Sequence, residues 1–277
     1  STAASASATA LELAIRRWGA AQLRILARWL GGRALALPLV FEAEDLRSLR
    51  AIFRGVAGHV PAERRLAGLI PTPTLPERAL QALAAAPTSG AASALLSVWR
   101  HPWAGAIAAA GSVGEVDLFA LETALAQASA ATAVERAARS GDGVLRALVR
   151  DAIDVENALT ALVLSIGEKD VEVDRPFLPG GRRLSLVAFR EAILAGGPQP
   201  AGRRLARAFD GTPVALLFSL HADDPATLEV ELRDHCVGDL ARRSHRAPLG
   251  PVTLLWFTCR LRTQMLELQR IVWAVAL

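Results

Sequence analysis

Apolar residues recur along most of this chain at the spacing of an α-helix, and they seldom alternate with polar residues. In the segment 42–57 the apolar positions repeat every three or four residues, at Leu46, Leu49, Phe53 and Val56. This spacing places them on one face of a helix, whereas a half-buried strand would show strict alternation. The pattern predicts an all-α fold.

The same pattern, with its capping and breaking residues, predicts the other helices. Ser185 and Asp224 are candidate N-caps, and Pro225 and Pro251 stand where a helix begins. Gly167 ends another helix, the charged segment 168–176 is expected to be extended, and the small residues 105–114 predict a connector. The remaining helices are expected over residues 8–30, 61–69, 76–86, 90–100, 115–138, 144–166, 186–195, 201–210, 213–220, 225–243 and from 251 to the C-terminus.

Parts of the helical pattern occur more than once. The segment Leu11–Ile15 returns as Leu121–Leu125 and more loosely as Leu228–Leu232. A period of about 109 residues is too long for a solenoid, whose repeats span roughly 20–50 residues. The repeat predicts three similar helical subdomains, over residues 1–112, 113–222 and 223–277.

A second set of residues follows the same period. An acidic residue on a helix, with Ser or Asn three residues later, precedes an apolar-Pro step at Ile70-Pro71 and again at Leu178-Pro179. The segment Glu267–Ile271 occupies the same place in the third copy. We predict a structural role for the motif residues, which are Asp45, Ser48, Asp154, Asn157, Glu267 and Arg270.

Composition narrows the function classes. The chain has 277 residues, 52% of them hydrophobic, with no tyrosine and a formal net charge of +4. So small a charge, without long basic runs, gives little support for nucleic acid binding. Two cysteines, Cys236 and Cys259, indicate a reducing compartment without a disulfide. No uncharged apolar run reaches about 18 residues, and residues 1–10 lack the basic start of a complete signal peptide.

One acidic cluster allows two interpretations. Asp151, Asp154 and Asn157 are spaced to share a helix face, as in helical enzymes that bind a diphosphate substrate through a divalent metal. The alternative is a structural network in which the acids bond arginines or backbone amides. We favour the network, because Asp45 and Ser48 repeat the pattern and no second acidic cluster completes a metal site. No phosphate-loop motif occurs, so we expect no catalytic residue, metal or cofactor.

Three surface segments are candidate contacts for a protein partner. The first is the end of a helix with Trp99, Arg100 and Trp103, since exposed aromatic residues often anchor interfaces. The others are the turn with Arg182 and Arg183, and the basic helix end with Arg242, Arg243 and Arg246.

The repeated motifs resemble those of the C subunit of archaeal and bacterial A/V-type ATPases, whose eukaryotic counterpart is the d subunit of the vacuolar ATPase. The residues that carry the resemblance are Asp154–Asn157 with Phe177–Gly181, Asp45–Arg50 with Leu69–Pro71, and Leu249–Pro251 with Glu267–Ile271.

The resemblance implies three helical subdomains in a funnel with pseudo-threefold symmetry, with the N-terminal part of the first one missing here. It also implies a non-catalytic cytoplasmic protein, peripheral to the membrane, that joins the central stalk to the membrane rotor ring during ion transport. Two alternatives stay open from the residues: the metal-dependent diphosphate enzyme and an unrelated helical adaptor.

Overall fold

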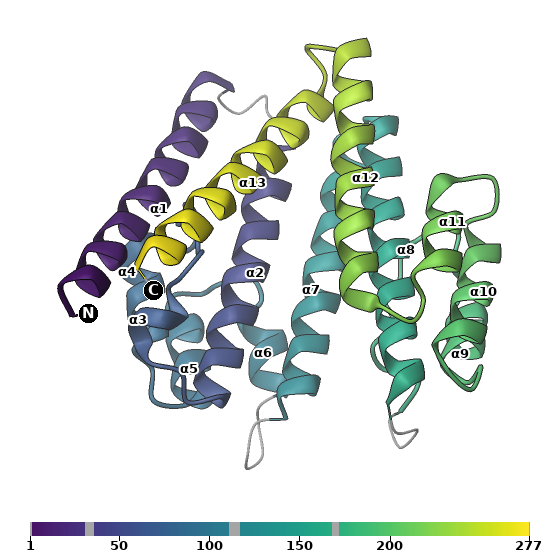
Figure 1. Ribbon diagram of the computed structural model, residues 1–277, viewed down its shortest axis with the longest axis horizontal. Coiled ribbons are helices and arrows are strands. Elements are labelled where there is room, and N and C mark those ends of the chain that lie inside the picture. The colour runs from purple at the N-terminus through teal and green to yellow at the C-terminus, as the bar shows by residue number, and fades with distance from the viewer. Residues whose placement is uncertain (1, 31–35, 111–116, 168–171, 277) are drawn as a thin grey trace. The chain divides into compact units, whose positions relative to one another are not determined.

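Every regular element that the structure describes is an α-helix (Figure 1). The structure is a computed structural model that describes residues 2–30, 36–110, 117–167 and 172–276. These residues form thirteen helices and no strand, which confirms the predicted all-α fold. None of the described helices combines the length and apolarity that a membrane span requires.

The chain divides into two compact units. Unit 1 comprises Ser1–Ser129 and Leu254–Leu277, and unit 2 comprises Ala130–Thr253. The division into three subdomains and their funnel arrangement remain predictions.

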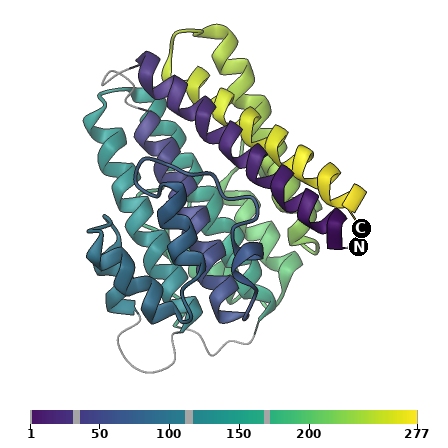
Figure 2. The ribbon, with the colours of Figure 1, turned by 90° about the vertical axis from the view of Figure 1, so that its left-hand side faces the viewer.

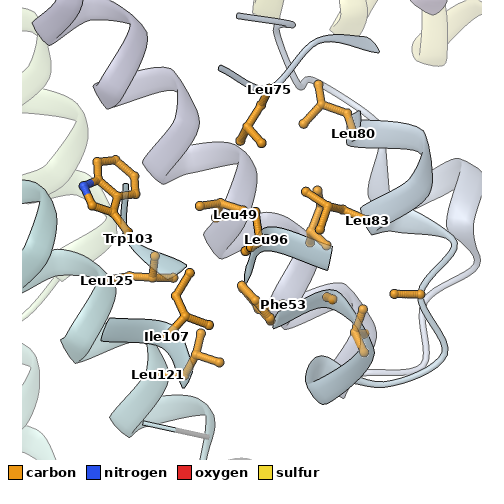
Figure 3. Close-up of a cluster of buried hydrophobic side chains, with 14 of the residues drawn as sticks. Leu49, Phe53, Leu75, Leu80, Leu83, Leu96, Trp103, Ile107, Leu121 and Leu125 are labelled. Carbon is orange, nitrogen blue, oxygen red and sulfur yellow. The ribbon is translucent and has the colours of Figure 1, made fainter. Parts of the chain in front are cut away.

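Unit 1 is built around α2 (Leu37–Ala57). Leu49, Ile52 and Phe53 of α2 are fully buried and contact leucines from the shorter helices around it (Figure 3). Burial of a side chain of this size contributes about 1.5–3 kcal/mol. The surrounding helices are α3 (Ala62–Arg65), α4 (Glu77–Ala84), α5 (Ser89–Val98), α6 (Ala104–Ala110) and the first half of α7 (Leu118–Arg139).

Two long helices at the chain ends complete unit 1. These are α1 (Thr2–Leu30) and α13 (Pro251–Ala276), which lie antiparallel and side by side in both ribbon views (Figures 1 and 2). Gly19 permits the close approach, because a Cβ there would stand 2.3 Å from Sδ of Met265. The pair packs on α2 through a small apolar cluster that includes Leu23, Val40 and Leu261.

Unit 2 holds a separate core. Its helices are the rest of α7, α8 (Gly143–Ile166), α9 (Leu186–Ile193), α10 (Pro198–Ala208), α11 (Pro213–Leu220) and α12 (Pro225–Arg246). Phe189 and Phe218 are fully buried. Phe218 stacks on Phe209 with ring centroids 5.5 Å apart, a contact that adds to the energy of burial itself.

The capping and helix-breaking residues of the sequence predicted most helix ends correctly. Ser185 Oγ accepts the Ala188 N–H at 3.2 Å, and Asp224 Oδ1 accepts the Thr227 N–H at 3.1 Å, so both predicted caps are confirmed. Asp142 caps α8 in the same way, a role that the sequence interpretation missed.

Two local predictions were wrong in the described residues. The expected connector 105–114 begins as α6, because Ile107 is buried in the core of unit 1 and its alanines favour a helix; residues 111–116 lie outside the described residues. The segment expected to be extended after Gly167 forms turns where it is described, with the Phe177 N–H donating to Asp174 O at 3.2 Å.

The two cysteines give a direct check of this arrangement. Cys236 on α12 is exposed, whereas Cys259 on α13 is partly buried, and burial raises the pKa of the Cys259 thiol. Because the thiolate is the reactive form, a maleimide should label Cys236 about tenfold faster than Cys259 near neutral pH. Mass spectrometry of a labelling time course measures both rates, and Cys236→Ser should abolish only the fast phase. Equal rates would contradict the burial of Cys259.

Candidate functional site: two turns bonded by buried aspartates

Each unit contains a buried aspartate that bonds the turn after an apolar-Pro step. Asp45 on α2 is 2% exposed and Asp154 on α8 is fully buried. Residues 71–75 form the Asp45 turn, and residues 179–184 form the Asp154 turn. Sequence reasoning singled out both aspartates, and the structure places each against the turn at the apolar-Pro step of its own unit.

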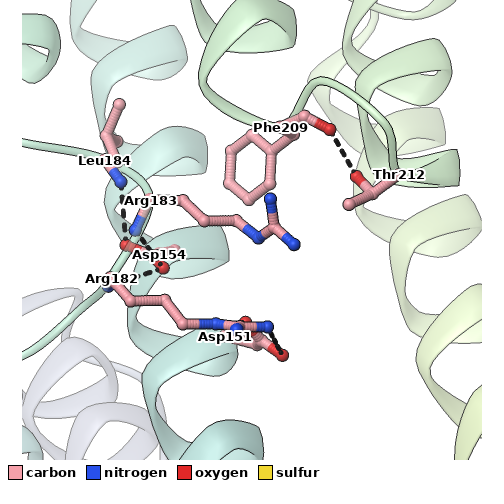
Figure 4. A network of polar contacts seen from close by, with 7 residues as sticks. All are labelled: Asp151, Asp154, Arg182, Arg183, Leu184, Phe209 and Thr212. Carbon is pink, nitrogen blue, oxygen red and sulfur yellow. Dashed lines mark hydrogen bonds and ion pairs between the residues drawn. The ribbon is translucent and has the colours of Figure 1, made fainter.

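Asp154 accepts three backbone hydrogen bonds from its turn (Figure 4). Its Oδ2 accepts the N–H groups of Arg182 and Arg183, both at 2.9 Å. Its Oδ1 accepts the Leu184 N–H at 3.1 Å. Converging backbone N–H groups form a concave anion site, and here the anion is the protein's own carboxylate.

Glycine is required where this turn passes the carboxylate. A Cβ on Gly181 would lie 2.1 Å from Asp154 Oδ1, closer than any real contact. Gly180 has a φ of +113°, a conformation that residues with a side chain rarely adopt. Gly181 is therefore explained by the approach of the turn to Asp154, and Gly180 by its backbone conformation.

Asn157 lies one helical turn after Asp154 and bonds the residue before the same turn. Its side-chain amide donates to Leu178 O and accepts the Leu178 N–H, both at 2.8 Å. Asn157 is fully buried, so this pair satisfies two backbone groups that water cannot reach.

Asp151 faces outward at the edge of this network. It accepts two bonds from the Arg182 guanidinium, at 2.7 and 3.0 Å. The hydrogen bond to Asp151 raises the pKa of Arg182. Both side chains are partly exposed, so this ion pair contributes little to stability compared with the buried bonds.

The Asp45 turn is also bonded to a buried carboxylate, but its donors are hydroxyl groups instead of backbone amides. Asp45 Oδ1 accepts the Thr72 hydroxyl at 2.5 Å, and Oδ2 accepts the Thr74 hydroxyl. Thr72 Oγ1 in turn accepts the Leu75 N–H at 2.9 Å. Ser48, the other predicted motif residue on α2, is also buried. Thus both copies of the motif use an aspartate carboxylate as the acceptor, whereas the donors are hydroxyl groups in one turn and backbone amides in the other.

The backbone before the Asp45 turn is bonded from α1. The Gly68 N–H donates to Glu12 Oε1 at 2.7 Å, and Arg16 Nε donates to Leu69 O at 2.7 Å. Trp273 of α13 donates to the other Glu12 oxygen at 2.6 Å. Burial lowers the pKa of the Arg16 guanidinium, although Glu77 and Glu12 oppose this effect.

Sequence reasoning predicted no polar contact for Glu12, Arg16 or Trp273. The available signal was an acid followed four residues later by an arginine on an otherwise apolar helix face, which indicates two charged groups facing the core.

The third copy of the motif does not show the buried contacts of the other two, although a structural role was predicted for it. Glu267 and Arg270 are exposed on α13, while Gln269 between them is buried. The reason is the register of α13, which turns Leu261, Met265 and Gln269 inward at intervals of four residues. The segment Glu267–Ile271 therefore lies mostly on the solvent-exposed side of α13.

The part of the chain that the structure describes offers no set of metal ligands for the diphosphate-enzyme alternative. The three amide bonds occupy Asp154, and Arg182 bonds Asp151. Within the described ranges, no group of three or more His, Cys, Asp or Glu side chains is arranged to bind a metal.

The predicted partner contacts divide into buried and exposed groups. Trp103 was wrong as a contact residue: it is 3% exposed and packs in the core of unit 1, edge-on to His101 at 5.3 Å. Its neighbour Trp99 is 40% exposed, and Arg100 has a φ of +56° at the tip of this helix end. This segment thus offers one tryptophan to a partner, not two.

The basic residues of the other two segments lie at the surface. Arg242 and Arg243 both pair with Asp239 on α12, at 3.4 and 2.6 Å. Arg246 is exposed at the end of that helix. Arg182 is exposed and Arg183 partly so, although their backbone amides bond Asp154.

Comparison with known proteins identifies a family for nearly the whole chain. Residues 1–276 match the family described as the ATP synthase (C/AC39) subunit. No curated protein matches the chain.

Proposed function

The chain belongs to the ATP synthase (C/AC39) subunit family, and from this premise we propose that it is the connector between the central stalk and the membrane rotor ring of an A/V-type ATPase. The match over residues 1–276 is the observation that carries the proposal. In this role the protein is non-catalytic, acts on the cytoplasmic side as a peripheral component of the complex, and couples rotation of the stalk to ion transport through the ring.

The bonded turns suit a part that transmits torque. A connector under load must keep its shape, and turns are usually the least stable segments of a fold. Here the Asp154 turn is fixed by five buried or part-buried hydrogen bonds, from Asp154 and Asn157. The Asp45 turn is fixed by two, to Thr72 and Thr74. Such bonds restrict the turns without adding any reactive group.

The exposed basic end of α12 is a proposed contact with a neighbouring protein of the complex. Arg242, Arg243 and Arg246 lie within five residues on the last turns of the helix. Charges of one sign at a helix end attract an acidic partner and set the rate and specificity of assembly. Trp99 and Arg100 are a second proposed contact, because an exposed tryptophan can bury a large area against a partner.

Charge reversal at the end of α12 tests the connector function. We expect the triple change Arg242→Glu, Arg243→Glu and Arg246→Glu to lower recovery of stalk and ring proteins at least tenfold in a pull-down at about 0.15 M salt. The melting temperature should stay within a few degrees of that of the unchanged protein, because surface substitutions change stability little.

Arg233→Glu is the matched control, since Arg233 is an exposed arginine on the same helix, paired with Glu229. It should leave recovery unchanged. The connector function would be contradicted if the unchanged protein recovered neither stalk nor ring proteins. Magnesium-dependent turnover of a diphosphate by the purified protein would favour the enzyme alternative instead.

A further inference from the structure

The α1·α13 pair leaves an unusual amount of apolar side chain in contact with solvent. On α1, Leu11, Trp18, Ile25 and Trp29 are 52%, 42%, 46% and 84% exposed. On α13, Leu268, Ile271 and Val275 are 43%, 59% and 83% exposed. Single exposed apolar residues are normal, but contiguous groups of this size mark interaction sites.

These residues form two rows that run beside each other. Glu12 bonds Trp273 and Gly19 lies against Met265, which fixes the antiparallel register of the two helices. In that register Trp18 is level with Leu268, and Leu11 is level with Val275. The α1 row extends from residue 11 to residue 29, about 27 Å at the rise of an α-helix.

Both rows lie on the side of the pair that faces away from α2. The side toward α2 is occupied by Ala20, Leu23 and Met265, which pack with Val40. Each row stands beside the seam between the helices, about a sixth of a turn or more from those inward residues. Together the two rows and the seam form one surface, named here the outer face of α1·α13.

The charges that border the outer face are nearly all positive. Arg28 is exposed on the far flank of α1, whereas Arg17 and Arg24 line a hollow together with Ala20, Pro71 and Glu77. Arg260 and Arg270 stand on the far flank of α13, where Glu267 is the one acid between them. Arg260 also lies over the Trp256 ring at 5.8 Å. A partner that covers the apolar rows meets Arg28, Arg260 and Arg270 at its edges.

We propose that the outer face of α1·α13 binds an amphipathic α-helix of a partner protein, with an apolar stripe flanked by Asp and Glu. The seam between two antiparallel helices is a groove into which a third helix packs. Leu11, Trp18 and Ile25 recur every seven residues, the spacing at which facing helices interdigitate. The arginines on both flanks supply the charge complementarity that selects an acidic helix.

Two other occupants fit these observations less well. A second copy of the chain would bring the same arginines together, and like charges facing each other oppose association. An anionic lipid surface would attract the arginines and tryptophans, but a lipid surface has no periodicity to match the seven-residue spacing. The inference does not depend on the connector function, since it concerns only the chemistry of this face.

A labelled synthetic peptide provides the test. The probe is a helical peptide of about 20 residues with leucines on one face and glutamates on both flanks, and the comparison peptide replaces every glutamate with lysine. Fluorescence anisotropy with the full chain should show at least tenfold tighter binding of the glutamate peptide, and the difference should shrink as salt rises.

Substitution on the face makes the test specific. The double variant Trp18→Gln/Ile271→Gln should weaken binding of the glutamate peptide at least tenfold. The control Leu216→Gln/Leu220→Gln changes two leucines of unit 2 that are 60% and 61% exposed, and it should leave binding unchanged. All four positions are exposed, so circular dichroism should show both variants folded.

Three results would overturn the proposal. The first is equal binding of the two peptides, or binding that the double variant leaves intact. The second is absence of peptide binding together with a dimer that Trp18→Gln/Ile271→Gln dissociates in sedimentation. The third is absence of peptide binding together with face-dependent binding to vesicles of phosphatidylserine and phosphatidylcholine.

Discussion

Asp154→Ala should lower the free energy of unfolding by about 3–5 kcal/mol, the largest effect of any single polar substitution proposed for this protein. The substitution removes a carboxylate that accepts three backbone N–H groups in a fully buried position. A hydrogen bond to a charged group is worth about 1.5–3 kcal/mol, and each buried donor left without a partner adds a cost.

The six tryptophans all fall in unit 1, which helps to locate this effect. Trp18, Trp29, Trp99 and Trp103 precede residue 130, and Trp256 and Trp273 follow residue 253. In a urea titration, tryptophan fluorescence therefore reports unit 1, whereas circular dichroism reports both units. We expect Asp154→Ala to shift the circular dichroism transition more than the fluorescence transition.

Asp151→Ala is the matched control, because Asp151 precedes Asp154 by one helical turn and bonds the same turn through Arg182. That ion pair is partly exposed, so its loss should cost no more than about 1 kcal/mol. Equal destabilisation by the two changes would show that the buried amide bonds are not what fixes the turn.

Gly202→Ala should destabilise unit 2 by about 2–3 kcal/mol, although alanine is the better helix former. Gly202 lies inside α10, and a Cβ there would stand 2.5 Å from Ala222 Cβ and 2.6 Å from Phe218 O. The second of these is a backbone atom, so α10 has to move away from the end of α11. Overpacking of this kind costs about 1–3 kcal/mol and exceeds the helix-propensity gain of about 1 kcal/mol.

Gly105→Ala is the control for propensity alone. Gly105 also lies in a helix, α6, but a Cβ there would meet nothing within 4 Å. This change should stabilise the protein by about 0.5–1 kcal/mol. Thermal unfolding by circular dichroism measures both variants, and a Gly202→Ala protein as stable as the parent would refute the close packing of α10.

Local sequence determined the helices and many of their ends. The three- and four-residue spacing in α2 requires no knowledge of what the helix packs against. Ser185 and Asp224 cap their helices through bonds to a residue three positions away, so the chemistry of each cap is contained in one short segment. The repeat of an acid before an apolar-Pro step likewise identified Asp45 and Asp154.

Only the tertiary structure decided what those groups contact. The Asp154 turn supplies backbone amides and the Asp45 turn supplies hydroxyls, a difference that the shared motif does not reveal. Glu12 bonds Gly68 and Trp273, which are 56 and 261 residues away. Trp103 was expected at the surface, but the packing of unit 1 buries it.

Periodicity tells which residues share a helix face, and the face that turns inward depends on the neighbours that the fold supplies. On α13 this choice buried Gln269 and exposed Glu267 and Arg270, against the motif alignment. The same choice exposed Trp18 and Ile271 on the outer face of α1·α13. Sequence thus determined the helices and the acidic residues that bond the turns, while contacts between distant segments selected the buried partners and the surface left open to others.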